Sequence, residues 1–477
     1  MMKREEFRQF GHQLIDWIAD YYENIEKYPV KSQVKPGEII DQLPSSPPSE
    51  SQSFENIMAD FEKIVLPGIT HWQSPNFFAY FPANSSMPSI LAELLTSALA
   101  VQGMVWETSP AATELEEQVM NWLKEMTGIP ENFYGVIQDT ASTSTLVALL
   151  SAREKISGFK INTEGFFSNN YRIYCSYEAH SSIEKAVKIA GFGKNSLTYI
   201  PVDEQLRMKP EALEEAISKD KKEGSIPVCV VSALGTTGTV AIDPIEKISK
   251  ICTDYNVWHH IDAAYAGSAM VLDEHRKYLR GIEKADSYVF NPHKWMFTNF
   301  DCSAYFVKDK GTLIKTFEIM PEYLKTASDK VVNNYRDWGI QLGRRFRALK
   351  LWFVIRSMGV DTIKSKIGNH IRWAEELAEI IKSDERFFLW EPQNLGLVCF
   401  RLNLKNVKDL DKRNSINKAF LDEINASGKA YLSHTKIRGE FTLRFVVAQT
   451  EVTREHVMGA FKMIQEISNN YISTNHE

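Results

Sequence analysis

Short β-rich runs alternate with helical segments from about residue 115 to residue 307, and this alternation most strongly constrains the fold. Clear apolar runs occur at 171–175, 227–231 and 257–261. Apolar runs between helices are typical of strands whose two faces are both covered, so the pattern predicts a mainly parallel α/β sheet. In such sheets ligands bind beyond the carboxyl ends of the strands, which directs attention to the residues after each run.

Two segments flank this region. Residues 7–25 place apolar side chains at helical spacing, and a polar, proline-rich linker over 31–53 separates that helix from the main body. The apolar stripe of this helix must pack against other apolar residues, either in the core of the same chain or on another subunit. Beyond residue 359, a helical segment precedes short strands at 397–401 and 442–446, which predicts a small α+β domain.

Composition narrows the class of protein. The chain has 477 residues, 24% of them charged, and a net charge of −6 without a concentrated basic run, so no nucleic-acid partner is expected. Residues 89–106 are the most apolar stretch, but Glu93 and Gln102 interrupt them, which favours a buried helix over a membrane span. The five scattered cysteines lack metal-ligand spacing and no export signal precedes them. We expect reduced thiols, no metal and a cytoplasmic location.

Lys294 lies between two runs of strand character, 286–290 and 303–307. Burying an ammonium group is costly unless its pKa falls or the amine reacts. A Schiff base with an aldehyde cofactor would explain a lysine at this position. The alternative is a lysine at a strand end whose head reaches solvent.

Three other strand ends carry polar groups. Asp262 follows the run 257–261, where it could pair with the ring nitrogen of a pyridine cofactor or cap the next helix. His180 follows the run 171–175, where it could stack on a ring or serve a structural role. The segment 138–145 offers hydroxyls at a helix start, which suits a phosphate or ordinary capping, and 235–239 offers more hydroxyls or a simple turn. Their combination with Lys294 favours pyridoxal 5′-phosphate.

The residues of these segments and the order of the segments resemble those of the group II pyridoxal-phosphate-dependent decarboxylases, specifically the aromatic-L-amino-acid decarboxylase family. The resemblance covers almost the whole chain. The segments that carry it are 66–72, 74–75, 78–82, 178–182, 262–267, 291–295, 299–303 and 342–346.

The resemblance implies a fold-type I pyridoxal-phosphate enzyme that works as a homodimer. Residues 1–80 would form an N-terminal helical segment that packs across the partner subunit. Residues 81–358 would form a large cofactor-binding domain with a mainly parallel, seven-stranded type of sheet. Residues 359–477 would form a small C-terminal α+β domain.

The resemblance also assigns roles to individual residues. Lys294 would carry the cofactor as a Schiff base, Asp262 would pair with the pyridinium nitrogen, and His180 would stack on the ring. Other cofactor contacts would come from Ala141, Ser142, Thr237, Asn291 and His293.

The expected reaction is decarboxylation of an aromatic L-amino acid (tryptophan, 5-hydroxytryptophan, DOPA, tyrosine or phenylalanine) to the amine and carbon dioxide, by way of an external aldimine and a quinonoid. Tyr323 matches the family's loop tyrosine, which is implicated in protonating the product carbon. Family members that make aldehydes oxidatively typically replace this tyrosine or the stacking histidine, and this chain keeps both. An aromatic aldehyde synthase and a non-catalytic cofactor-binding homologue are the alternatives.

The substrate pocket is inferred from the same resemblance. It would be lined by Trp72, Tyr80, Phe81, Pro82, Ala83, Met104 and Gly343. Gly343 stands where a small residue leaves room for an indole or catechol, whereas Ala83 stands where a threonine often helps to hold the substrate carboxylate. Asp139, next to the expected phosphate loop, has no explanation in the sequence, because an aspartate beside a phosphate is unfavourable.

Overall fold

The computed structural model describes residues 2–166, 170–319 and 331–473. The chain forms two compact units. The larger contains residues 83–372 and 391–397, and the smaller contains residues 1–82, 373–390 and 398–477. The N-terminal segment therefore clusters with the C-terminal residues in one unit.

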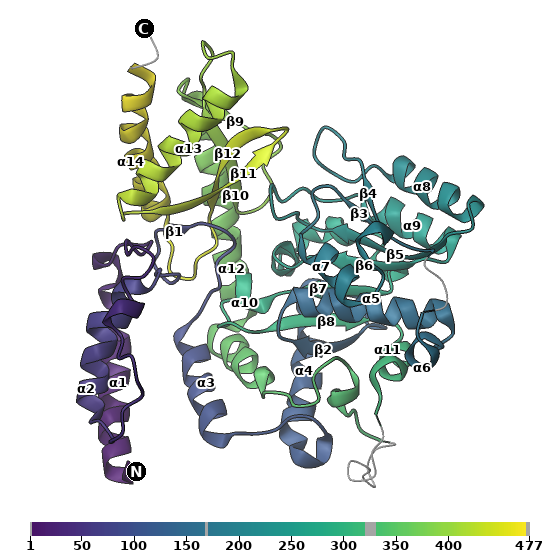
Figure 1. Ribbon diagram of the computed structural model, residues 1–477, viewed down its shortest axis with the longest axis horizontal. Helices are drawn as coiled ribbons and strands as arrows, with labels where there is room; N and C mark the ends of the chain where they lie inside the picture. Colours follow the sequence, from purple (N-terminus) through teal and green to yellow (C-terminus); the bar gives the residue numbers. More distant parts are fainter. Residues whose placement is uncertain (1, 167–169, 320–330, 474–477) are drawn as a thin grey trace. The chain divides into compact units, whose positions relative to one another are not determined.

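The larger unit is built on a seven-stranded sheet with the order β2-β8-β7-β6-β5-β3-β4 (Figure 1). β8 runs antiparallel to its neighbours β2 and β7, and the other neighbouring pairs are parallel. The strands are β2 (Tyr134–Gln138), β3 (Tyr171–Ser176), β4 (Leu197–Ile200), β5 (Ile226–Ala233), β6 (Trp258–Asp262), β7 (Ser287–Phe290) and β8 (Ser303–Val307).

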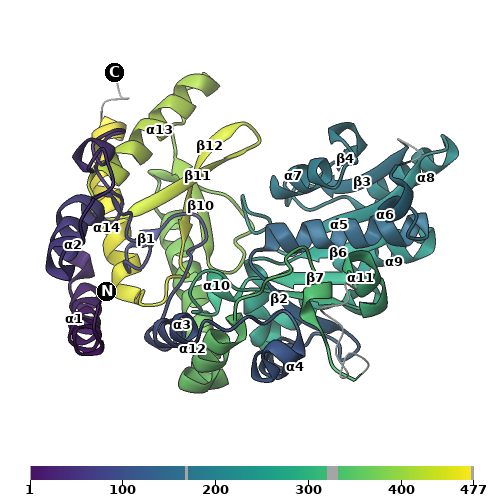
Figure 2. The ribbon, with the colours of Figure 1, turned by 60° about the horizontal axis from the view of Figure 1, so that its bottom comes forward.

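Helices cover both faces of this sheet. Buried side chains of α5 and α7 share one apolar cluster with β3 and β5, whereas those of α8 and α9 pack on the opposite face (Figure 2). The helices of this unit are α3 (Met87–Leu99), α4 (Pro110–Thr127), α5 (Ala141–Ser157), α6 (Ile161–Glu164), α7 (Ser182–Ile189), α8 (Pro210–Lys222), α9 (Ile245–Tyr255), α10 (Pro292–Trp295) and α11 (Lys310–Phe317). Helix α12 (Arg347–Ser383) begins here and is interrupted at Gly359, whose φ is +71°.

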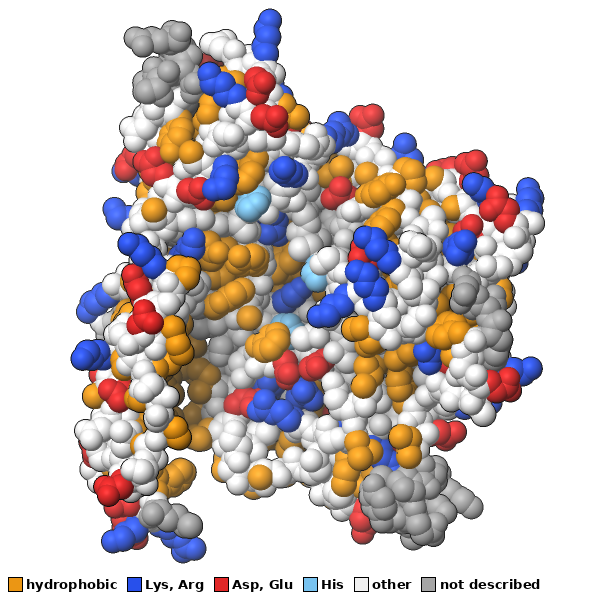
Figure 3. Space-filling model, in the orientation of Figure 1, with side chains coloured by type: hydrophobic (Ala, Val, Ile, Leu, Met, Phe, Trp, Pro, Cys, Tyr) orange, Lys and Arg blue, Asp and Glu red, His pale blue; other side chains and the backbone are white. Residues whose placement is uncertain are grey.

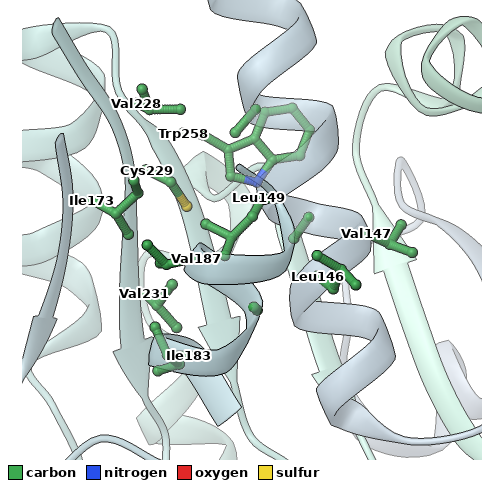
Figure 4. Packing of buried hydrophobic residues seen from close by; sticks show 14 of the residues in the cluster. Leu146, Val147, Leu149, Ile173, Ile183, Val187, Val228, Cys229, Val231 and Trp258 are labelled. Carbon is green, nitrogen blue, oxygen red and sulfur yellow. The ribbon is translucent and has the colours of Figure 1, made fainter. Parts of the chain in front are cut away.

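The core beneath α5 follows from strand alternation. Ile173 and Val231, from neighbouring strands, point to the same side and meet Leu149 of α5 and Val187 of α7 (Figure 4). Each of these four side chains is almost completely buried. Burying such a side chain stabilises the fold by about 1.5–3 kcal/mol, so this cluster fixes α5 against the strands.

The smaller unit contains a five-stranded sheet with the order β1-β11-β12-β10-β9. Its strands are β1 (Phe77–Phe78), β9 (Phe387–Leu389), β10 (Leu397–Leu402), β11 (Tyr431–Ile437) and β12 (Glu440–Val446). Its helices are α1 (Arg4–Glu23), α2 (Phe54–Asp60), α13 (Leu410–Ala426) and α14 (Arg454–Ser473). The two-residue strand β1 pairs in parallel with β11, which ties the N-terminal segment to the C-terminal sheet.

Helix α1 finds only part of the partner that its apolar stripe requires. Phe10 stacks on Phe54 with ring centroids 4.5 Å apart, and the Tyr21 hydroxyl lies 2.8 Å from His71 Nδ1. None of its residues is buried, and Phe7 remains 63% exposed. Hydrophobic side chains accordingly show on the surface of the α1–α2 region, at the lower left of Figure 3.

The prediction of a buried helix over residues 89–106 is wrong. Helix α3 ends at Leu99, and it turns the small residues Ser89, Ala92 and Thr96 inward. Its larger side chains face outward, because Leu91, Leu94, Leu95 and Leu99 are each 45–61% exposed. Hydropathy alone does not distinguish an apolar helix that is buried from one with an uncovered apolar face.

The predicted fold class is confirmed: the large unit is a mainly parallel, seven-stranded α/β structure. The runs at 171–175, 227–231 and 257–261 correspond to β3, β5 and β6, with ends that differ by at most two residues. Across the described ranges, no helix is both long and apolar enough to cross a bilayer.

Candidate active site

The loops after β2, β3, β5, β6 and β7 leave the same edge of the sheet. β3, β5, β6 and β7 are parallel, and β2 shares their direction because it and β7 are both antiparallel to β8. The chain moves outward from β3 to β4 and then returns inward from β5 through β6 to β7. This reversal of strand order is where open α/β sheets bind ligands.

Asp262 is the last residue of β6 and is partly buried. Its Oδ1 accepts a hydrogen bond from the Ala264 amide at 3.0 Å, so the carboxylate fixes the turn that follows the strand. The turn packs tightly against β7, since a Cβ on Gly267 would lie 2.4 Å from Cβ of Phe290. The hydrogen bond to the turn therefore uses Oδ1 of Asp262. It is compatible with a second role for the same carboxylate in binding a ligand.

Lys294 lies in the short helix α10, directly after β7, and is partly buried. Two contacts fix its backbone: the Lys294 amide donates to the Asn291 carbonyl at 2.9 Å, and the Asn84 side-chain amide donates to the Lys294 carbonyl. The Asn291 amide donates to the Ala264 carbonyl at 3.0 Å. The segments that carry Lys294 and Asp262 are thus joined directly.

His180 follows β3, and its ring is held by the start of α7. Its Nδ1 accepts from the Ser182 amide at 3.1 Å, which places the ring proton of the neutral form on Nε2. Burial lowers the pKa of His180, the Asp262 carboxylate acts to raise that pKa, and the Lys294 ammonium acts to lower it. All three side chains therefore share one electrostatic environment, in which the imidazole is kept neutral.

The N-terminus of α5 contributes the loop after β2. Thr140 is the N-cap residue, Ala141 is buried, and Ser142 is exposed at the first turn. Both carboxylate oxygens of Asp139 are engaged: Oδ1 accepts from the Thr140 amide at 2.6 Å, and Oδ2 accepts from Gln341 Nε2 at 3.3 Å. These contacts explain how an aspartate is tolerated next to amides and hydroxyls that suit a phosphate.

A chain of buried polar groups links α5 to the lysine segment. Ser144 Oγ lies 3.4 Å from Ser303 Oγ on β8, and the Ser303 hydroxyl donates to Asn291 Oδ1 at 2.7 Å. On the same segment, His293 Nδ1 accepts from the Cys302 amide at 2.9 Å, and burial followed by the charge of Lys294 lowers the pKa of His293 to about 3. These contacts fix Asn291 and keep His293 neutral.

Gly343 and Met104 lie in two loops that are joined to each other. The Gly103 amide donates to the Arg344 carbonyl at 2.9 Å, and Gln102 Oε1 accepts from the Arg344 amide at 2.6 Å. A Cβ on Gly343 would lie 3.3 Å from Gln102 Nε2. A side chain at position 343 therefore acts first on the Gln102 amide.

The remaining predicted residues belong to other segments of the chain. Thr237 is exposed on the loop after β5, and that loop is closed by a bridge between Leu234 and Ile242. Ala83 lies in the larger unit next to Asn84. Tyr323 lies outside the described residues. The aromatic wall belongs to the smaller unit, and its approach to the cofactor residues stays a prediction: Trp72, Tyr80, Phe81 and Pro82.

Residue-level reasoning missed Asn84, Ser303 and Gln102. Asn84 holds the Lys294 segment, Ser303 holds Asn291, and Gln102 lies against Gly343. Ser303 belongs to a segment that was already singled out, 299–303, but neither polarity nor spacing indicates which serine faces inward. Asn84 follows the aromatic segment 78–82, and that position was its only signal.

The side chains at this edge match one kind of ligand. A lysine amine suits an aldehyde, a carboxylate suits a basic ring nitrogen, a neutral imidazole suits the face of a flat ring, and the start of α5 suits a phosphate. Lys294, Asp262, His180 and Ser142 supply these groups from four different loops. The donor set fits a phosphorylated pyridine aldehyde.

Comparisons with known proteins agree with this chemistry. Residues 36–403 match the family described as the pyridoxal-dependent decarboxylase conserved domain. Phenylacetaldehyde synthase of Arabidopsis thaliana is 42% identical over 98% of this chain and 96% of its own length. Aromatic-L-amino-acid decarboxylase of Mus musculus is 41% identical over the full length of both chains. The crystal structure of Oryza sativa TDC with PLP and tryptamine superposes with a TM-score of 0.95 at 35% identity, covering 98% of this chain and 99% of that one.

The fold and the matches define the class of this protein: it is a pyridoxal-phosphate-dependent enzyme of fold-type I. Within that class the chain belongs to the group II pyridoxal-dependent decarboxylases, and its cofactor is pyridoxal 5′-phosphate.

The buried link through Ser303 can be tested by removing one hydroxyl. We expect Ser303→Ala to weaken cofactor binding about tenfold, because a buried acceptor that loses its donor costs about 1–3 kcal/mol and Asn291 is no longer held. Cofactor dissociation followed by absorption measures the effect. Ser196→Ala is the control, since that hydroxyl donates to the Phe192 carbonyl, away from the cofactor loops. Equal cofactor affinity in the two variants would contradict the role of Ser303.

Proposed function

We propose that this enzyme decarboxylates aromatic L-amino acids to the corresponding amines and carbon dioxide. One observation carries the proposal: His180, Asp262 and Lys294 follow the parallel strands β3, β6 and β7 at one edge of the sheet, and the Asn291 amide joins the Lys294 segment to the Asp262 segment. This combination suits a cofactor that is bound covalently, protonated at its ring nitrogen and covered on one face. The aromatic-L-amino-acid decarboxylase of Mus musculus supports the substrate class.

In this proposal each residue of the edge has one task. Lys294 would bind the aldehyde carbon of the cofactor, Asp262 would keep the ring nitrogen protonated, and His180 would stack on the ring. When bound, pyridoxal phosphate supplies an electron sink for the bond that breaks. Ala141, Ser142, Asn291 and His293 would hold the phosphate, and Thr237 would lie near the ring.

The substrate side chain would contact aromatic and small residues. Trp72 and Tyr80 are stacked with ring centroids 5.8 Å apart and are 36% and 48% exposed, so they offer an aromatic surface to a ligand. We propose that this surface, together with Phe81 and Pro82, accepts the substrate ring. Met104 and Gly343 would be further substrate contacts, and Ala83 would stand near the substrate carboxylate.

Proton delivery decides which product forms. We propose that Tyr323, which lies outside the described residues, donates the proton to the carbon that has lost its carboxylate. An amine then leaves the enzyme. Retention of both Tyr323 and His180 favours this outcome over oxidative formation of an aldehyde.

The alternative is an aromatic aldehyde synthase, and the relative named phenylacetaldehyde synthase keeps that alternative open. Overall identity does not separate the two reactions, because this relative and the decarboxylase of Mus musculus match almost equally well. The difference must therefore lie in single residues, and Tyr323 is the one that the proposal rests on.

We further propose that the enzyme is a cytoplasmic homodimer. Uncovered apolar surface supports the dimer: Phe7 and Leu14 of α1 are 63% and 38% exposed, and four leucines of α3 are uncovered. Apolar patches of this kind mark protein interfaces. The organisation into an N-terminal swapped segment (1–80), a large domain (81–358) and a small domain (359–477) belongs to the same proposal.

Product analysis tests the reaction. Holoenzyme is incubated with tryptophan, 5-hydroxytryptophan, DOPA, tyrosine and phenylalanine, and amine, aldehyde and hydrogen peroxide are assayed together. We expect amine as the main product, and we expect Tyr323→Phe to reduce amine formation by about 10²-fold or more, because general-acid catalysis contributes this much. Aldehyde with peroxide from the unaltered enzyme would favour the alternative, and full amine formation by Tyr323→Phe would remove Tyr323 from proton donation.

Substrate size is tested at position 343. In Gly343→Ser we expect the ratio of kcat/KM for tryptophan to that for tyrosine to fall about tenfold, because a displaced Gln102 amide reduces the space for an indole and such steric differences are worth about 1–3 kcal/mol. Gly459→Ser is a suitable control, since a Cβ there meets nothing within 4 Å. An unchanged ratio in Gly343→Ser would show that position 343 does not set substrate size.

A further inference from the structure

A cavity lies in the larger unit, apart from the cofactor loops. It has a volume of about 440 Å³ and is bounded by the start of α9, the helical turns near residue 278 and the segment around Pro392. Cavities of this size hold small organic ligands. None of the residues assigned to the cofactor contributes to its lining.

The lining of this cavity is rich in positive charge. Four of its residues are cationic and two are acidic, in a chain whose net charge is −6. The cations are Arg207, Lys247, Lys277 and Arg280, and the acids are Asp243 and Glu246. The local excess of positive charge is therefore opposite in sign to the charge of the whole protein.

One of the two acidic side chains, Asp243, is already hydrogen-bonded to the backbone of the protein. Asp243 is buried, its Oδ1 accepts from the Met208 amide at 2.7 Å, and its Oδ2 accepts from the Ala233 amide at 2.7 Å. Both oxygens are thus engaged by backbone. Burial also raises the pKa of Asp243 to about 6, which weakens its negative charge further in mildly acidic solution.

The cations have little competing attraction. Within the described ranges, neither Lys277 nor Arg280 has an ion-pair partner, although Lys277 lies over the Tyr278 ring at 5.1 Å. Lys247 lies 3.8 Å from Glu211, and both of those side chains are exposed, so the pair contributes little. Arg207 is paired with Asp203. Two to three positive groups are therefore available to a ligand.

We propose that this cavity binds a small compound that carries a polyphosphate group. Guanidinium and ammonium groups together provide the charge-assisted hydrogen bonds that phosphate oxygens require. Tyr278, Pro244 and Pro392 add an apolar wall that suits an attached ring. The proposal does not depend on which reaction the enzyme catalyses.

The lining of the cavity is connected to the cofactor site through strand β5. The Asp243 amide donates to the Ala233 carbonyl at 3.0 Å, and Ala233 is paired in register with Asp262. The intervening loop, closed by the bridge between Leu234 and Ile242, carries Thr237. The lining of the cavity is therefore continuous along the chain with the loop that carries the proposed cofactor contact Thr237.

Calorimetric titration of the holoenzyme with inorganic pyrophosphate, ATP and adenosine tests the proposal. The cofactor stays bound, so its own phosphate site is filled. We expect pyrophosphate and ATP to bind with a Kd below about 1 mM, ATP more tightly, and adenosine to bind undetectably. We expect the double variant Lys277→Glu/Arg280→Glu to bind both anions at least about tenfold more weakly, since each reversal replaces attraction with repulsion.

The matched control is Lys219→Glu/Lys222→Glu, which makes the same change of charge on the exposed face of α8, outside the cavity lining. It should keep the affinity of the unaltered enzyme. Three results would each overturn the proposal: no binding of either anion to the holoenzyme, equal weakening by the two double variants, or equal binding of ATP and adenosine. Cofactor absorption in both variants verifies that the fold and the cofactor site are intact.

Discussion

The parallel register of β6 and β7 is the constraint on which the candidate active site depends. It sets Asp262 opposite Val289, and the Asn291 amide then reaches the Ala264 carbonyl just beyond the strand ends. A slip of one residue would turn every side chain of a strand to the opposite face. Asp262 would then face the side of α9 instead of the side of α5, and the Lys294 segment would lose its anchor.

Buried polar contacts beneath the site hold this register. His260 lies two residues before Asp262 on the same face of β6, with Nε2 3.3 Å from the Thr145 hydroxyl of α5 and Nδ1 2.9 Å from the Ser287 hydroxyl of β7. Burial lowers the pKa of His260 to about 3, so the imidazole ring is neutral at neutral pH. A satisfied polar group in a core favours one arrangement over its alternatives, because leaving such a group unpaired costs about 1–3 kcal/mol.

Sequence reasoning recovered the sheet and the identity of the residues at its edge, because strand runs and the polar groups after them are local signals. Lys294, Asp262 and His180 were found in this way. The inward contacts of Ser303 and Asn84 were not predictable, since they depend on which strands become neighbours. β8 follows β7 in the chain and also pairs with β2, and only that second pairing brings Ser303 near Ser144.

Two further features depended on tertiary structure. Asp139 looked unfavourable beside a phosphate loop, but its contacts with Thr140 and Gln341 remove the difficulty. The apolar stretch 89–106 looked like core, whereas α3 presents leucines to the surface. In both cases the sequence specifies the chemical type of the side chain, but long-range packing decides where that side chain points.

The central claim is that Lys294 binds the cofactor covalently at this edge, and absorption spectroscopy of Lys294→Ala tests it most directly. The unaltered enzyme should carry a band in the near-ultraviolet to visible range, and Lys310→Ala, which alters a partly exposed lysine of α11 above the Tyr134 ring, should keep it. The account predicts that Lys294→Ala loses this band and all turnover, with its fold intact by circular dichroism. A Lys294→Ala protein that keeps the same band would show that another residue binds the cofactor and would contradict the account.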